Sequence, residues 1–242
     1  MPKYRFAVLA AKNTADVAAI RETRSSHNSK YAAQYHPWLI VPNAAPGVSN
    51  ATLTISPESA ICGIFARCDT ERGVHKAPAN EVLRGALRFS TAISGPVRDV
   101  LNPEGINCLR SFEGRGNLVW GGARTISNDP EWIYINIRRL AIYLEHSIVR
   151  GTSWAVFEPN DDKLWRKIRL AIEAFLLEAW RNGALAGIKP EEAFFVRCDH
   201  MTMSQNDLDE GRLICLVGFA PIKPAEFLIL RIMQWTARAS IL

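Results

Sequence analysis

The most regular pattern of apolar and polar positions lies between residues 129 and 183. Its first part predicts a helix that begins near Asn136 and ends at Gly151, because glycine closes a helix at little conformational cost. Apolar side chains recur there at steps of three and four: Ile137, Leu140, Tyr143, Leu144 and Ile148. Such spacing places them on one face, which we expect to be buried.

A short strand and a longer helix are expected next. Ser153–Phe157 is too short for a helix and rich in aromatic and β-branched residues, which favours a central strand. Pro159 ends it, and a helix follows over Lys163–Asn182 and stops at Gly183. Its apolar side chains cover more than half of its circumference: Leu164, Trp165, Ile168, Ala171, Ile172, Phe175, Leu176, Ala179 and Trp180. This helix lies either between a sheet and a further element or simply in the core of an α/β domain.

The remaining segments add strands on both sides of this stretch. Strands are expected at Tyr4–Leu9, Trp38–Val41, Thr52–Ile55, Cys108–Phe112, Leu118–Trp120, Ala193–Cys198, Arg212–Phe219 and Ala225–Trp235, with helices at Thr14–Arg24, Pro57–Arg67 and shortly after residue 97. This order predicts an α/β (α+β) protein with a mixed β-sheet flanked by helices. A polar loop at Asp69–Asn80 suggests two parts, residues 1–85 and 86–242.

The last expected strand is apolar on both faces. One face carries Phe227, Ile229, Arg231 and Met233, and the other carries Leu228, Leu230, Ile232 and Gln234. A strand of this kind is covered on both sides or shared with a neighbouring molecule.

Composition limits the class of function. The chain has 242 residues and a mild net charge of +5, and no arginine-rich arm accompanies its basic positions. Its five cysteines form no CxxC pair, which indicates reduced thiols and synthesis in the cytosol. No run of apolar residues is long enough to span a membrane.

Candidate catalytic and metal-binding motifs are weak. Gly114-Arg-Gly116 lacks the third glycine of a dinucleotide loop and favours a turn. Cys198-Asp199-His200 alternates across a strand, so its side chains point to opposite faces and have no second ligand cluster.

Two further histidines are interpreted as structural. Glu145-His146-Ser147 consists of consecutive helix positions that diverge, so it forms no triad, and His36 precedes Pro37 in a packed aromatic segment. The sequence therefore predicts no enzyme, no catalytic residue, no cofactor and no metal site.

From Ser29 onwards, several long strings resemble the contractile tail sheath proteins of bacteriophages and related injection particles. They are SKYAAQYHPWL (29–39), FARCDTERGVHKAPAN (65–80), GRGNLVWGGARTISNDPEWIYINIRRLAIYLEHSIVRGTSWAVFEPND (114–161), EEAFFVRCD (191–199) and VGFAPIKPAEFLILRI (217–232). They occur in collinear order over most of residues 29–235.

The resemblance implies a structural subunit of a virion tail or injection particle, assembled in the bacterial cytoplasm. Its partners would be further copies in stacked hexameric rings, the tail tube protein, and the baseplate and tail terminator proteins, without membrane insertion or direct contact with nucleic acid. Residues 1–85 would end the sheath α/β domain, and residues 86–242 would form the sheath C-terminal domain. The strand Phe227–Gln234 would be shared between subunits.

The same resemblance suggests that Lys163, Arg166 and Lys167, which share one helix face, meet an acidic tube. A plain solvated face is the alternative. The family's usual N-terminal arm has no obvious counterpart before Tyr4, so a minimal sheath or a piece of a longer one is expected, with the minimal sheath preferred. Other classes left open are a nucleic-acid-binding α/β module using basic helix faces and a degenerate α/β enzyme.

Overall fold

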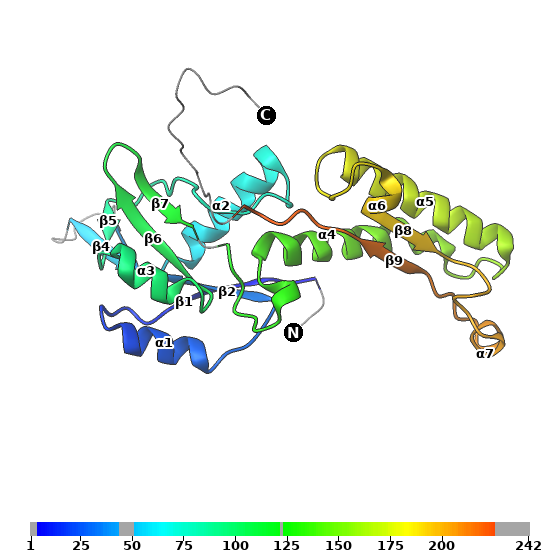
Figure 1. The fold of residues 1–242 in the computed structure, drawn as a ribbon, viewed down its shortest axis with the longest axis horizontal. Coiled ribbons are helices and arrows are strands. Elements are labelled where there is room, and N and C mark those ends of the chain that lie inside the picture. Colours follow the sequence, from blue (N-terminus) through cyan, green and yellow to red (C-terminus); the bar gives the residue numbers. More distant parts are fainter. Residues whose placement is uncertain (1–3, 44–50, 122, 226–242) are drawn as a thin grey trace, which may run out of the picture.

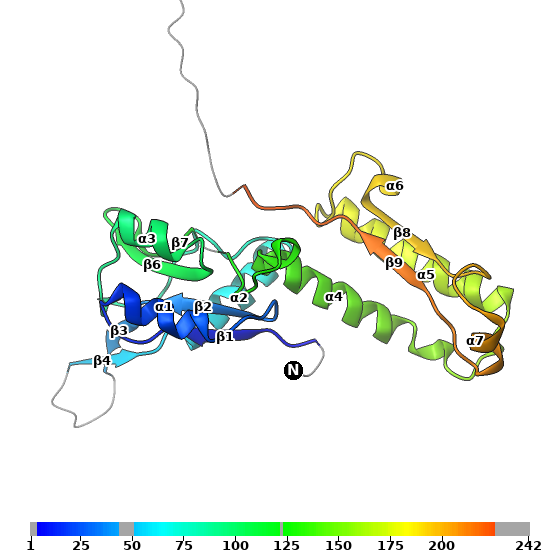
Figure 2. The same cartoon turned by 60° about the horizontal axis from the view of Figure 1, so that its bottom comes forward.

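The computed structural model describes residues 4–43, 51–121 and 123–225, and they form two lobes joined by a long helix (Figures 1 and 2). The N-terminal lobe contains β1 (Ala7–Ala10), α1 (Val17–Ser25), β2 (Ala32–His36), β3 (Leu39–Pro42), β4 (Thr52–Ile55), α2 (Glu58–Arg72), β5 (Arg88–Phe89), α3 (Gly95–Leu101), β6 (Ile106–Phe112), β7 (Gly116–Trp120) and the 3-10 turn η1 (Pro130–Trp132). The connecting helix is α4 (Ile135–Gly151). The second lobe, here called the arm, contains η2 (Ser153–Ala155), α5 (Asp162–Arg181), α6 (Pro190–Ala193), β8 (Phe194–Arg197), α7 (Gln205–Asp209) and β9 (Leu216–Phe219).

The main sheet of the N-terminal lobe has the strand order β1-β2-β6-β7. β2 runs parallel to β1 and β6, and β7 returns antiparallel to β6 through a hairpin. All five residues of β2 are buried, as expected for a central parallel strand covered on both faces. A second sheet, with the order β4-β3-β5, is antiparallel.

The helix α4 belongs to two hydrophobic cores. Ile135, at its start, packs with Tyr35, Leu109 and other residues of the N-terminal lobe. Leu140 and Leu144, further along, pack with α5 and the arm strands. Near its start, the buried Arg138 lies over the rings of Tyr31 and Trp132, which shield its charge. The amphipathic helix predicted from Asn136 to Gly151 is therefore confirmed, and it ties the two lobes together.

The longer helix α5 covers the two-stranded sheet formed by β8 and β9. Asp161 caps it by accepting a hydrogen bond of 2.9 Å from the Leu164 amide, and Gly183 follows its end with a positive φ of 74°. Its buried side chains are Leu164, Trp165, Ile168, Ile172 and Leu176. The predicted helix over Lys163–Asn182 is confirmed, and its apolar face packs on the β8–β9 sheet and α4.

The mixed α/β class is confirmed, but the strand arrangement differs from the expectation in two places. Ser153–Phe157 is not a strand: it forms η2 and an exposed link between α4 and α5, with Phe157 fully exposed. Conversely, the structure contains a strand that was not predicted: β2 ends at His36, before the strand predicted at Trp38–Val41. Among the described strands none pairs with the link at Ser153–Phe157, so its aromatic and β-branched composition does not make it a strand.

The strands that the structure describes form separate sheets rather than the single mixed sheet expected. Strands before and after residue 85 share the β1-β2-β6-β7 sheet. How the chain divides into independently folding units remains a prediction. The strand expected at Ala225–Trp235 lies outside the described residues, apart from Ala225.

Candidate interaction surfaces

The predicted basic face of α5 is exposed. Lys163, Arg166 and Lys167 point away from the core that Leu164 and Trp165 enter, because positions three and four apart share a helix face. None of these three cations forms an ion pair with a residue in the described part of the chain. They therefore present unpartnered positive charge on the outer side of the arm.

A second surface is the outer edge of β8. β9 pairs with β8 from Phe194↔Phe219 to Arg197↔Leu216, and within the described ranges no strand pairs with the opposite edge of β8. An unpaired edge offers backbone donors and acceptors to another strand.

An apolar groove of about 690 Å³ lies on that side of β8, between β8, α5 and α6. Leu170 of α5 and Phe195 of β8 line it, and these residues are 55% and 52% exposed. The other lining residues are Ala174, Leu177, Pro190, Phe194 and Val196, together with the acidic Glu173 and Glu191. The outer edge of β8 and the groove beside it together offer backbone and side-chain contacts for an added strand.

The sequence pattern did not indicate this edge. The alternation in AFFVRC shows which residues face inward, with Val196 and Cys198 buried and Phe195 and Arg197 exposed. It does not show which strands are neighbours. The residues of the predicted inter-subunit strand, Phe227–Gln234, lie outside the described residues.

Polar contacts fix the arm to the N-terminal lobe. The Asn136 Nδ2 group donates to the His75 carbonyl at 2.9 Å and to the Ile222 carbonyl at 3.4 Å. Leu185 and Pro221 form an isolated antiparallel bridge nearby. The segment that leads toward the C-terminus is thus held at the junction of the two lobes.

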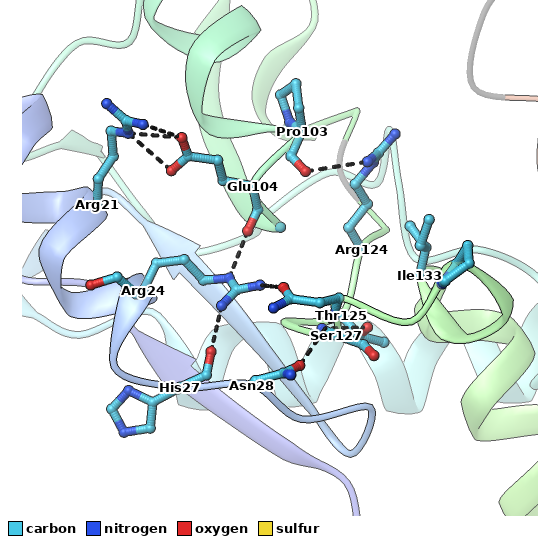
Figure 3. Close-up of a pocket in the computed structure, with 14 residues that line it drawn as sticks. Arg21, Arg24, His27, Asn28, Pro103, Glu104, Arg124, Thr125, Ser127 and Ile133 are labelled. Carbon is cyan, nitrogen blue, oxygen red and sulfur yellow. Dashed lines mark hydrogen bonds and ion pairs between the residues drawn. The ribbon is translucent and has the colours of Figure 1, made fainter.

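A hollow of about 590 Å³ in the N-terminal lobe collects several arginines (Figure 3). The buried Arg24 donates to the Glu104 carbonyl at 2.6 Å, to the Asn128 Oδ1 at 3.1 Å and to the His27 carbonyl. Burial lowers the pKa of Arg24 from its usual value. Arg21 pairs with the Glu104 carboxylate at 2.6 Å. These contacts hold α1 against the loops that contain Glu104 and Asn128. Arg21 and Arg24 thus have partners within the protein and need no bound substrate to balance them.

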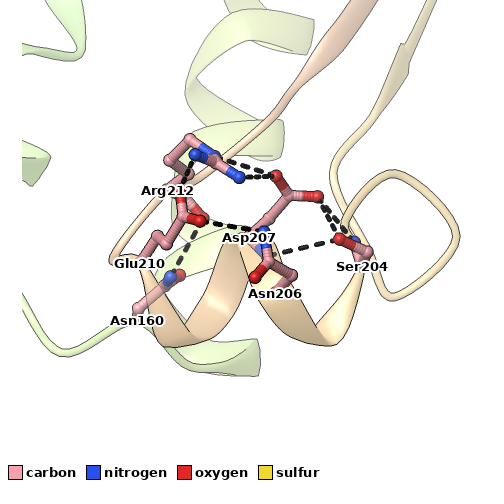
Figure 4. A network of polar contacts seen from close by, with 6 residues as sticks. All are labelled: Asn160, Ser204, Asn206, Asp207, Glu210 and Arg212. Atoms are coloured by element: carbon pink, nitrogen blue, oxygen red, sulfur yellow. Dashed lines mark hydrogen bonds and ion pairs between the residues drawn. The ribbon is translucent and has the colours of Figure 1, made fainter.

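A network at the end of the arm holds α7 in place (Figure 4). Ser204 and Asp207 form a capping box, and the Arg212 Nε donates to Asp207 at 2.9 Å. The hydrogen bonds from Ser204, followed by the one from Arg212, lower the pKa of Asp207 to about 2. Asn160 donates to the Arg212 carbonyl at 3.2 Å and so joins this loop to the start of α5.

The weak motifs do not converge on a reaction centre. Gly114 and Gly116 have positive φ values in the β6–β7 hairpin, which confirms the predicted turn. Cys198 is buried, whereas His200 is exposed beside Trp165 and Asp162. His146 stacks on Tyr4.

His36 is buried in β2, as predicted for a packing residue. In the part of the chain that is described, no group of three or more His, Cys, Asp or Glu side chains could hold a metal ion. No described helix combines the length and the apolar character needed to cross a membrane.

Two protein-family models together match almost the whole chain. The family model for the phage tail sheath protein central domain matches residues 2–125, and that for the phage tail sheath C-terminal domain matches residues 127–234. The two models meet later in the chain than the boundary after residue 85 expected from loop composition.

Individual proteins and solved structures also match the chain. The tail sheath protein of Escherichia phage P2 is 28% identical over 193 residues, covering 76% of this chain and 46% of that protein. The sheath complex of an extracellular contractile injection system, PVC, in its contracted state is 36% identical, with a TM-score of 0.86 over 95% of this chain and 64% of that one.

A chain of the anti-feeding prophage (AFP) baseplate is 38% identical, with a TM-score of 0.83 over 96% of this chain and 60% of that one. The chain thus spans about half the length of the P2 sheath and less than two thirds of these structures. With both sheath family models matched in collinear order, the chain belongs to the phage tail sheath protein family.

Proposed function

We propose that this chain is a structural subunit of a contractile sheath in a virion tail or injection particle. Its copies would form hexameric rings that stack around a tail tube, and contraction of the stack would drive the tube through the envelope of a target cell. The proposal rests on membership of the sheath family. The observation on the molecule that carries it is the outer edge of β8, which no strand among the described residues pairs with and which lies beside an apolar groove.

The proposed subunit contact is strand addition. Phe227–Gln234 of one copy would pair with the outer edge of β8 in a neighbour, extending its two-stranded sheet. Backbone hydrogen bonds would set the pairing, and alternate apolar side chains would enter the groove beside Leu170 and Phe195. A two-stranded sheet is marginal alone, so an added strand also stabilises the arm.

The proposed tube contact is the basic face of α5. Lys163, Arg166 and Lys167 are exposed and unpartnered in the described residues, as an acidic tube surface requires. Exposed ion pairs are individually weak, about 0–1 kcal/mol, but the contact would repeat in every ring. Baseplate and tail terminator proteins would contact the two ends of the stack.

The proposed energy source is assembly itself. The sheath would be built in an extended arrangement that is higher in free energy than the contracted one, and the baseplate would release it. In this proposal the protein is not an enzyme and uses no nucleotide.

Electron microscopy of the expressed full-length chain tests the proposal. We expect tubular polymers by negative stain, and a chain ending before Ala225 is expected to form none while keeping its helical circular dichroism spectrum. A matched control is replacement of Arg231 by Lys, which keeps the strand pattern. Normal tubes from the truncated chain would refute the strand contact, and salt-dependent DNA binding without polymers would favour a nucleic-acid-binding module.

A further inference from the structure

Two cysteines stand opposite each other at the end of the β8–β9 sheet. The last paired residues of the ladder are Arg197 and Leu216, so Cys198 and Cys215 are the next residues outward on the two strands. Both contribute to the arm core, together with Val196 and Val217 on the same face. Directly opposite side chains on one face of an antiparallel pair lie within contact distance.

The backbone spacing at this position suits a disulfide. The Ala220 amide donates to the Ala193 carbonyl at 2.8 Å, which makes these two a hydrogen-bonded pair. Pair types alternate along an antiparallel ladder, so Cys198 and Cys215 fall at a non-hydrogen-bonded position, where Cα atoms lie about 4.5 Å apart. Disulfides span Cα separations of about 4.4–6.8 Å.

The two thiols also share one environment. Cys198 is buried and Cys215 is half-buried, and both pack in the arm core. We propose that Cys198 and Cys215 are a redox-sensitive pair that closes to a disulfide when the protein meets an oxidising small-molecule disulfide. The bond would fasten the end of the β8–β9 sheet and enclose the loop that carries α7.

The reaction is a pair of thiol–disulfide exchanges. Cys215 is half-buried and Cys198 is buried, so a disulfide of the oxidised glutathione class reaches Cys215 first. The Cys215 thiolate attacks one sulfur of that disulfide, forms a mixed disulfide and releases one small thiolate. The Cys198 thiolate then attacks Sγ of Cys215 and releases the second small thiolate. The two protein protons pass to these thiolates, so one small disulfide is reduced as one protein disulfide forms.

The surroundings keep the pair reduced until such exposure. Burial raises the pKa of both thiols, that of Cys215 to about 12. Of the charged groups that face the pair, Asp199 and Glu173 raise these values further, and Arg169 opposes them at Cys198. Little thiolate forms near neutral pH, so closure is slow in the reducing cytosol.

Mapping the linkage tests the proposal directly. The folded full-length chain is incubated with oxidised glutathione, free thiols are blocked with N-ethylmaleimide, and the product is digested with trypsin without reduction. Cleavage after Arg197 and Arg212 leaves Cys198 and Cys215 on different peptides. We expect a linked pair of these peptides that disappears with dithiothreitol, and a Tm several degrees above that of the reduced chain.

The control is Cys62, which is exposed on α2. Cys62→Ser is expected to leave the linked peptides unchanged, whereas Cys215→Ser is expected to abolish them. The proposal is overturned if the folded chain gives only glutathione adducts at Cys215 or Cys62. It is also overturned if the linked peptides appear only after unfolding in urea, or if the linked chain melts at the same temperature as the reduced one.

Discussion

Arg139 of α4 binds Asp69 of α2 through two parallel hydrogen bonds, from Nη1 to Oδ1 at 2.9 Å and from Nη2 to Oδ2 at 2.5 Å. The two side chains are only 16% and 27% exposed, and the guanidinium also lies 4.6 Å from the centroid of the Phe65 ring. A planar guanidinium can bind both carboxylate oxygens and stack on a ring at once, which a lysine ammonium cannot do.

Arg139→Lys is therefore expected to destabilise the chain even though it preserves the charge. The loss of one of two charge-assisted hydrogen bonds and of the ring contact predicts a decrease of about 1–2 kcal/mol in the free energy of unfolding. Urea denaturation of the full-length chain measures it. Arg150→Lys, at an exposed position of the same helix, is the matched control. Equal stability of the two variants would contradict this role for the paired hydrogen bonds.

The stability of the N-terminal lobe is expected to fall in mild acid because of His36. Burial lowers the pKa of His36 from 6.5 to about 4. Below pH 6.5 the unfolded chain binds a proton that the folded chain does not, so this contribution is present above pH 6.5 and is lost as the pH falls towards 4. Between pH 7 and pH 5 the loss is roughly 2 kcal/mol.

Urea denaturation at a series of pH values checks this expectation. His36→Gln, even if it is less stable overall, should flatten the profile between pH 7 and pH 5, because the glutamine side chain does not titrate. A variant profile as steep as that of the unaltered chain would assign the acid sensitivity to other groups.

Charge reversal on the basic face of α5 is expected to weaken attachment to the tube and leave the fold intact. Lys163→Glu, Arg166→Glu and Lys167→Glu are all exposed changes, so packing is preserved. Cosedimentation of sheath with tube protein at several salt concentrations measures the attachment, which should also weaken with salt in the unaltered sheath. Equivalent reversals at Arg84, Arg88 and Arg115, exposed in the N-terminal lobe, control for net charge. Unchanged cosedimentation of the α5 variant would leave this face as a solvated one.

Contraction is expected to move subunits as rigid bodies. The helices α4 and α5 share one core, so residues 135–181 should superpose between extended and contracted particles, while the contacts between subunits persist by bending at their connecting segments. Electron cryomicroscopy of both states tests this. Refolding of these helices, or a requirement for added ATP, would be incompatible with energy stored in assembly.

The long helices could be predicted because their apolar spacing is regular and their ends carry local signals, such as Asp161 before α5 and Gly183 after it. β2 could not, because a strand buried on both faces has no alternation of polar and apolar residues. Ser153–Phe157 has the composition of a strand, and only the tertiary structure shows that none of the described strands pairs with it.

Of the candidate surfaces, the basic face of α5 follows from spacing along a helix. The open edge of β8 does not, because the neighbours of a strand are set by segments distant in sequence. The facing of Cys198 and Cys215 depends on the same long-range register. Sequence patterns thus predict the surface of one element better than contacts between two.

The helix α4 has a mechanical consequence for the whole molecule. Its first residues are embedded in one core and its later turns in the other, so no flexible linker lies between the lobes at this point. A pull applied to the arm passes along the helix and its backbone hydrogen bonds into the β1-β2-β6-β7 sheet. A force on the arm therefore acts on both lobes, and a displacement of the arm also moves the N-terminal lobe because no flexible segment at α4 absorbs it.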